Sequence, residues 1–190
     1  MPFFGGSKVK LLDRPLLFID LEMSGLDVDR HEILEVAALL VDPNNFEIKS
    51  SYYSKIAPVH IHTADPQALE VIGYDPKNWH DAISLRQMLT ELSALAPNCI
   101  LAGWSVQNEW DFLIYALKKE NLPYFFYNYL LEVSTLVYIK HKHQLLSLGM
   151  SAVSRHFKIY LDQHKPDSDI RATYEIFKKL ISCSHQKPRN

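Results

Sequence analysis

The chain has 190 residues, of which 47% are hydrophobic and 12% aromatic, and its formal net charge at pH 7 is -2. This length and apolar content suit one globular domain, residues 1–190, and are short for two. A surface so close to neutral argues against a protein that binds a phosphate backbone through bulk positive charge.

Cysteine usage and hydropathy favour a cytoplasmic protein. Cys99 and Cys183 are too few for a disulfide framework and have no metal-ligand spacing, so both are expected to be reduced thiols. The segment Met1–Lys10 has no apolar core of signal-peptide length. The apolar run Val36–Val41 is far too short to cross a bilayer.

The first predicted strand ends in two acidic residues. Leu16–Ile19 is short and apolar, and Asp20 and Glu22 follow it directly. Side chains two apart in a strand share a face, so these carboxylates should project together on the side of Phe18. Two like charges so close favour a hard divalent cation between them, such as Mg²⁺ or Mn²⁺. By themselves they fit the polar end of a strand that enters a loop better than a metal site, unless the chain supplies further ligands.

The elements that follow predict an α/β fold with a mixed five-stranded sheet flanked by helices. Three strands joined by short turns form an antiparallel meander, and two parallel strands then alternate with helices. Ligands of such sheets gather at strand ends. The expected strands are Leu16–Ile19 with the acids at its end, Glu32–Asp42, Glu47–Ile56, Asn98–Trp104 and one within Tyr127–Val133; the expected helices are Pro66–Ile72, Ser84–Leu95, Asn108–Lys119, one from Ser134, one from Leu146 and one from about Pro166 to Ser182.

A third acid, Asp111, lies in the first turns of the helix after the fourth strand. Trp110, Leu113 and Ile114 are expected to face the sheet, which would leave Asp111 between the core and the crevice at the strand ends. The helix dipole alone also favours an aspartate there, so this position does not decide between a ligand and a stabilising charge.

A histidine and a fourth acid precede and open the last helix. Pro166 suits a first helical position, which puts His164 in the loop before it and Asp169 in its first turns. A histidine on that loop can reach a metal site to which Asp169 points.

These residues follow the motif order of a known family. D-x-E on the first strand, an Asp at the start of a central helix and H-x4-D near the end resemble the DEDDh exonucleases, which include RNase T, the proofreading subunit of DNA polymerase III and oligoribonuclease. The oligoribonuclease branch is most similar locally: Asp20–Leu26 reads DLEMSGL for its DLEMTGL, and Tyr124–Leu136 resembles its segment that ends in YLDVSTL. The resemblance covers about residues 14–182, the expected core.

The resemblance implies an RNase H-like fold and a 3'-to-5' exonuclease that releases nucleoside 5'-monophosphates from short RNA or single-stranded DNA. It also implies a homodimer. Two divalent ions, Mg²⁺ or Mn²⁺, would be held by the acids, and an imidazole would act as general base. The implied ligands are Asp20, Glu22, Asp111 and Asp169, the base is His164, and the seat of the 3'-terminal nucleotide is Met23, Ser24, Gly25 and Leu26.

Some positions depart from the family pattern and keep alternatives open. The last motif usually reads H-x-A-x-D-D, whereas Pro166 and Ser168 stand here, so Asp167 competes with Asp169 as its acid. The segment Ala68–Tyr74 resembles the proofreading-type relatives more closely than oligoribonuclease. A proofreading-like DNA exonuclease, or a catalytically inactive nucleic-acid-binding module of the same fold, is therefore an alternative.

Overall fold

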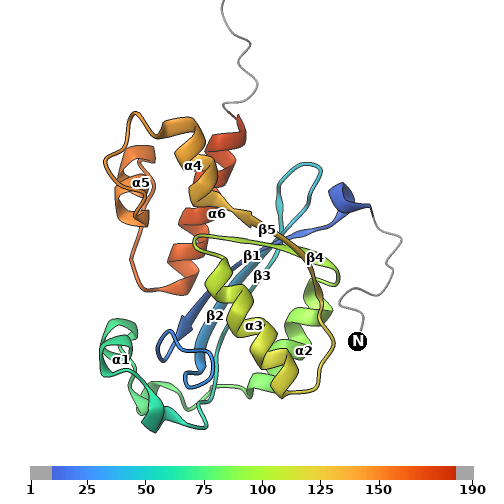
Figure 1. Cartoon of the computed structure of the whole chain (residues 1–190), viewed down its shortest axis with the longest axis vertical. Helices are drawn as coiled ribbons and strands as arrows, with labels where there is room; N and C mark the ends of the chain where they lie inside the picture. Colours follow the sequence, from blue (N-terminus) through green and yellow to red (C-terminus); the bar gives the residue numbers. More distant parts are fainter. Residues whose placement is uncertain (1–9, 183–190) are drawn as a thin grey trace, which may run out of the picture.

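The computed structural model describes residues 10–182 and consists of one sheet with helices on both sides (Figure 1). Two expectations fall outside the described residues: that residues 1–9 contain no signal peptide, and that Cys183 is a reduced thiol. No helix between residues 10 and 182 is long and apolar enough to span a membrane. The strands are β1 (Leu16–Met23), β2 (Ile33–Val41), β3 (Ile48–Lys55), β4 (Cys99–Gly103) and β5 (Phe126–Glu132); the helices are α1 (Pro66–Ile72), α2 (Leu85–Leu95), α3 (Gln107–Lys119), α4 (Val133–His141), α5 (Met150–Phe157) and α6 (Pro166–Ser182).

The sheet has the order β3-β2-β1-β4-β5, with β1 in the centre. The pairs β1/β2 and β2/β3 are antiparallel, and β1/β4 and β4/β5 are parallel. The predicted topology of three antiparallel and two parallel strands is therefore confirmed. Because β1 and β4 run in the same direction, the end of β1 and the start of α3 meet at one edge of the sheet.

Alternation along β1 divides the core into two layers. Leu17, Ile19 and Leu21 belong to a cluster that packs against α2 and α3. Leu16 and Phe18 belong to a second cluster that includes residues of α4, α5 and α6. Asp20 and Glu22 share the parity of Phe18, so they point to the α6 side, as the strand geometry predicted.

Local sequence signals set the helix starts that matter for the site. Helix α6 begins at Pro166, where the missing N–H costs no hydrogen bond. Helix α2 begins after Ser84, whose hydroxyl accepts the Gln87 N–H at 3.2 Å. Helix α1 begins at Pro66 after the cap Asp65 and ends at Gly73, which is left-handed with φ 69°.

Candidate active site

Three carboxylates meet where the central strand faces the last helix. Asp20 and Glu22 come from β1, and Asp169 comes from the first turn of α6. Each offers one oxygen, and these oxygens all lie within 4.8 Å of one another. Asp167 does not join them: it is exposed and forms an ion pair with Arg171 at 2.9 Å. Of the two candidates in the last motif, Asp169 is the one directed at β1.

The fourth acid beside this cluster is Glu109, not Asp111. Glu109 lies in the first turn of α3, is 5% exposed and interacts electrostatically with Asp20 and Glu22. Asp111 is exposed, and its carboxylate accepts a hydrogen bond from the Gln107 side chain at 2.9 Å. A step of two residues along a helix turns the side-chain direction by about 200° around the axis, so Glu109 and Asp111 point in nearly opposite directions. The expectation that Asp111 faces the crevice is corrected accordingly.

The rotation of α3 explains the difference. Its buried residues recur at three-to-four spacing, whereas Trp110 and Ile114, expected to face the sheet, are only partly buried. The spacing of apolar residues in the sequence indicates this stripe, and Glu109 continues it toward the N-terminus of α3. The buried residues of α3 are Glu109, Phe112, Leu113, Ala116 and Leu117.

A carboxylate at the end of β5 holds the backbone that leads into α3. Glu132 accepts hydrogen bonds from the N–H groups of Ser105 at 3.1 Å and Val106 at 2.9 Å. It also caps α4 by accepting the Ser134 N–H at 3.0 Å. Ser105 has φ 58°, a left-handed conformation that turns the chain toward the helix. These contacts fix the direction in which Glu109 projects.

The electrostatics of the cluster favour protonation when no cation is bound. Burial, and then the charges of Glu109, Glu22 and Asp169, raise the pKa of Asp20 well above its ordinary value. Burial, Asp169 and Glu35 raise the pKa of Glu22 to about 7. Burial is also the main reason that the pKa of Glu109 rises to about 8. Several carboxylates therefore cannot all ionise together without a positive partner.

The donor set fits divalent cations. The Oε2 atom of Glu109 and the Oδ1 atom of Asp169 are buried and have no hydrogen-bond partner among residues 10–182. Buried carboxylate oxygens are normally hydrogen-bonded or coordinated to a metal. Clustered carboxylates without nitrogen or sulfur ligands suit hard ions such as Mg²⁺ or Mn²⁺. Asp20, Glu22, Glu109 and Asp169 are the residues that would hold them.

A fifth carboxylate, which the sequence reasoning missed, lies behind the cluster. Glu35 pairs with Glu22 across β1 and β2, and its Oε2 accepts a hydrogen bond from the Tyr53 hydroxyl at 2.8 Å. The residue is 8% exposed. Its only sequence signal was an acid within the otherwise apolar β2. Because its negative charge contributes to the raised pKa of Glu22, it adds to the demand for a cation.

His164 lies beside the cluster on the loop that enters α6. Its backbone N–H donates to the Oδ2 of Asp169 at 3.0 Å, which ties the loop to the cluster. The residue is exposed and has φ 62°. Non-glycine residues in this region are uncommon, and they concentrate at functional sites. His164 lines a cavity of about 290 Å³ with Glu35, Tyr53 and Trp79.

The segment expected to seat a terminal nucleotide continues β1 past Glu22. Ser24 is buried; its N–H donates to the Glu32 carbonyl, and its hydroxyl accepts the Glu32 N–H, both at 2.8 Å. Gly25 has φ 149°, and a Cβ there would lie 2.4 Å from the His31 ring. Only glycine fits this position. Met23 is partly buried and Leu26 is 80% exposed, so Leu26 is open to a ligand.

Manganese is expected to stabilise the protein more at pH 8 than at pH 6. The folded pKa values of Glu22 and Glu109, about 7 and 8, exceed the ordinary 4.5. Without metal, the unfolded state loses these protons first, so stability falls as the pH rises from about 4.5 to 8. A bound cation replaces the protons and removes this penalty. Thermal unfolding with Mn²⁺ against EDTA should show a shift at pH 8 at least about twice that at pH 6.

The matched control for this measurement is Asp111→Asn, which should retain the pH-dependent shift because Asp111 lies outside the cluster. Asp20→Asn should lose most of it. Equal shifts at the two pH values, or a larger shift at pH 6, would contradict cation binding by these carboxylates.

The sheet order, the helices on both faces and the acids on its central strand define an RNase H-like fold. The model of the RNase_T exonuclease family matches residues 17–177, and the chain belongs to this family. The family resemblance of the sequence motifs is thereby confirmed.

Two curated relatives match short segments of the chain. A probable oligoribonuclease of Schizosaccharomyces pombe is 46% identical over 41 residues, which are 22% of this chain and 16% of that protein. The oligoribonuclease of Corynebacterium efficiens is 59% identical over 32 residues, 17% of this chain and 14% of that protein. The matched segments thus cover less than a fifth of either relative.

Solved exonuclease I structures share the fold. The alignment with one exonuclease I structure covers 90% of this chain and 41% of the exonuclease I chain, with a TM-score of 0.78 and 15% identity. The zinc-bound complex of Escherichia coli exonuclease I with single-stranded DNA covers 91% and 41%, with a TM-score of 0.75 and 15% identity. At this identity the likeness shows the fold alone.

Proposed function

We propose that the protein is a metal-dependent 3'-to-5' exonuclease that acts on short RNA or single-stranded DNA. The observation that carries this proposal is the convergence of four carboxylates, Asp20, Glu22, Glu109 and Asp169, at the end of β1 in a chain of the exonuclease family. Because these carboxylates are buried and repel one another, their ionised forms are unfavourable without a positive partner. They are therefore well suited to bind hard cations.

The proposed chemistry is hydrolysis of the last phosphodiester bond by water. Two divalent ions, when bound, would supply a nucleophile at neutral pH and neutralise charge on the attacking and leaving oxygens. Asp20, Glu22, Glu109 and Asp169 hold and orient this charge. His164 accepts the proton of the attacking water, for which an imidazole is suited near neutral pH. The product is a nucleoside 5'-monophosphate.

The proposed position of the substrate follows from the chain beyond the acids. Main-chain groups of Met23, Ser24 and Gly25 receive the terminal sugar, and the exposed Leu26 packs against a base. The Met23–Leu26 segment is held rigidly by the hydrogen bonds between Ser24 and Glu32, which favours precise placement of the strand end. A cytoplasmic location and a homodimer remain predictions.

The substrate class is expected to follow the two oligoribonuclease matches. Purified protein with Mn²⁺ should release nucleoside 5'-monophosphates from RNA of about two to five nucleotides at least about tenfold faster than from long single-stranded DNA. The measurement is chromatographic separation of released mononucleotides over time. EDTA should lower release at least about 100-fold, and excess Mn²⁺ should restore it.

Each of the other possible results favours a different activity for this protein. Faster release from long single-stranded DNA would favour the proofreading-like alternative. Release of internal fragments or of 3'-phosphates would exclude the proposed reaction. Binding of oligonucleotides without any release, under conditions in which the protein binds Mn²⁺, would favour the inactive binding module.

A further inference from the structure

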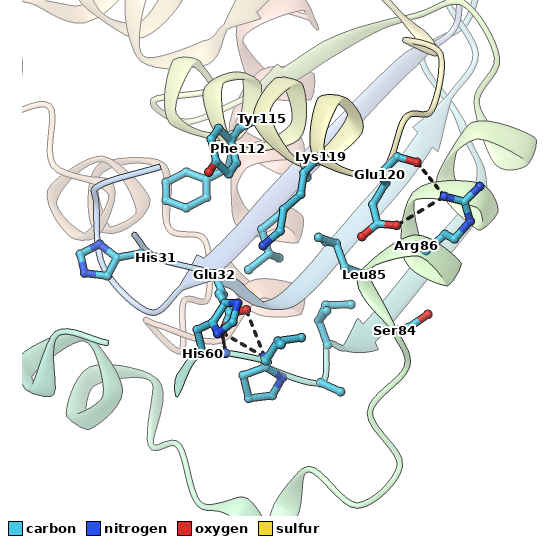
Figure 2. A pocket seen from close by; sticks show the side chains of 16 residues that line it. His31, Glu32, His60, Ser84, Leu85, Arg86, Phe112, Tyr115, Lys119 and Glu120 are labelled. Atoms are coloured by element: carbon cyan, nitrogen blue, oxygen red, sulfur yellow. Dashed lines mark hydrogen bonds and ion pairs between the residues drawn. The ribbon is translucent and has the colours of Figure 1, made fainter. Parts of the chain in front are cut away.

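A cavity of about 510 Å³ opens on the face of the sheet covered by α2 and α3 (Figure 2). Its walls come from the start of β2, the chain just after β3, the first turn of α2 and one side of α3. None of the four carboxylates of the candidate site lines it. Asp20 and Glu22 point to the opposite face of the sheet. Glu109 lies one turn before Phe112 on α3, and Glu32 bonds to Ser24, so the cavity adjoins the proposed catalytic centre without including its carboxylates.

The body of the cavity is apolar. Phe112 and Ala116 of α3 are each 4% exposed, and Ile33 and Ile56 come from the sheet side at 4% and 1%. Leu85 of α2, which is partly buried, closes one end. A volume of this size, in which hydrophobic and aromatic residues make up the larger part of the lining, is typical of small-molecule sites.

Most charged groups of the lining already have hydrogen-bond or ion-pair partners within the protein. The Glu32 carboxylate accepts hydrogen bonds from the N–H groups of Val59 and His60, the shortest at 2.7 Å. Arg86 donates to the Glu120 carbonyl at 2.7 Å and lies 3.4 Å from its carboxylate. These groups shape the walls and leave little capacity to bind a ligand.

Lys119 is the charged lining residue without such a partner among residues 10–182. Its side chain extends from α3 toward the middle of the cavity in Figure 2, and it has no hydrogen bond or ion pair with any of residues 10–182. The Glu32 carboxylate keeps its charge but its oxygens already accept backbone N–H groups, and Arg86 pairs with Glu120. Among the charged lining residues, Lys119 is therefore the one whose hydrogen-bonding capacity is unused within residues 10–182. An ammonium next to apolar walls favours a ligand that combines an apolar body with an anionic group.

We propose that this cavity binds a small amphipathic anion, with its apolar body between α3 and the sheet and its acidic group paired with Lys119. The proposal does not depend on the exonuclease function, since the site shares none of the acidic residues.

Two fluorescent probes with the same ring system test the proposal. 8-Anilinonaphthalene-1-sulfonate carries an anionic group, and N-phenyl-1-naphthylamine lacks it. With EDTA present, the sulfonate is expected to bind one molecule per chain. Lys119→Met should weaken its affinity about tenfold and that of the neutral probe less than about twofold. Lys118→Met, at the exposed neighbouring lysine that does not line the cavity, is the matched control.

Two further variants locate the bound probe. Ala116→Phe fills the cavity from α3 and should abolish binding of both probes, with circular dichroism to establish that the variant is folded. Asp20→Asn should leave both affinities unchanged, because the acids lie elsewhere. The proposal is overturned if the sulfonate does not bind, if Lys118→Met weakens it as much as Lys119→Met, or if both probes lose affinity equally in Lys119→Met.

Discussion

Replacing Glu109 by glutamine is expected to slow nucleotide release by about 10³-fold, whereas Asp111→Asn should slow it less than about twofold. Glu109 is buried next to Asp20, and its unpartnered oxygen is available to a cation. Glutamine keeps the shape of the side chain but removes the charge that holds the ion. Asp111 lies two residues away on the exposed side of α3, and among the described residues its carboxylate bonds only to the Gln107 side chain. Steady-state release from a short RNA with Mn²⁺ measures both variants.

The stability of the same variants separates lost chemistry from lost structure. With its pKa near 8, Glu109 is mostly ionised at pH 8.5 and repels Asp20 and Glu22. Glu109→Gln should therefore stabilise the metal-free protein at this pH by about 1–2 kcal/mol. A slow variant with a raised unfolding midpoint supports a ligand role. If Asp111→Asn is the slower variant, the fourth ligand is Asp111, as the sequence motif predicted, and the proposed role of Glu109 is wrong.

Asp20→Asn is expected to have the largest effect on catalysis, a loss of about 10⁴-fold or more. Asp20 is the central member of the cluster, since the charges of Glu22, Glu109 and Asp169 all act on it. Asp169→Asn should cost about 10³-fold, because Asp169 both offers a buried oxygen and accepts the His164 N–H. Single-turnover release with saturating enzyme and Mn²⁺ isolates the chemical step.

The matched control for Asp169 is Asp167, two residues earlier on the same helix. Asp167 is exposed and forms an ion pair with Arg171, so Asp167→Asn should change release by less than about twofold. Wild-type rates for Asp20→Asn, or a larger loss in Asp167→Asn than in Asp169→Asn, would remove the basis of the proposed site.

The sequence predicted the parts of the site that depend on local geometry. Alternation along β1 places Asp20 and Glu22 on one face whatever surrounds the strand, because side chains two apart always point the same way. Pro166 likewise determines where α6 begins, and the interval from His164 to Asp169 then follows. The order of elements also predicted the five-stranded mixed sheet.

The assignment on α3 failed for a different reason. An acid near the start of a helix can point in any direction around the axis, and each residue changes that direction by about 100°. Motif spacing favoured Asp111, but the apolar stripe of Phe112, Leu113 and Ala116 determines which side packs on the sheet. Glu132, some 23 residues beyond Glu109 in the sequence, holds the turn before the helix. Such a contact between distant residues leaves no local pattern.

The sequence alone thus determined the fold class, the family and the two acids whose direction the strand repeat sets, Asp20 and Glu22; the structure chose Asp169 over Asp167. The tertiary structure decided which face of α3 meets them, and it selected Glu109 over Asp111. It also brought Lys119 to an apolar cavity formed by four separate segments. Strand and helix periodicity act over a few residues and can be read along the chain, whereas the burial and charge of a group depend on which distant elements pack around it.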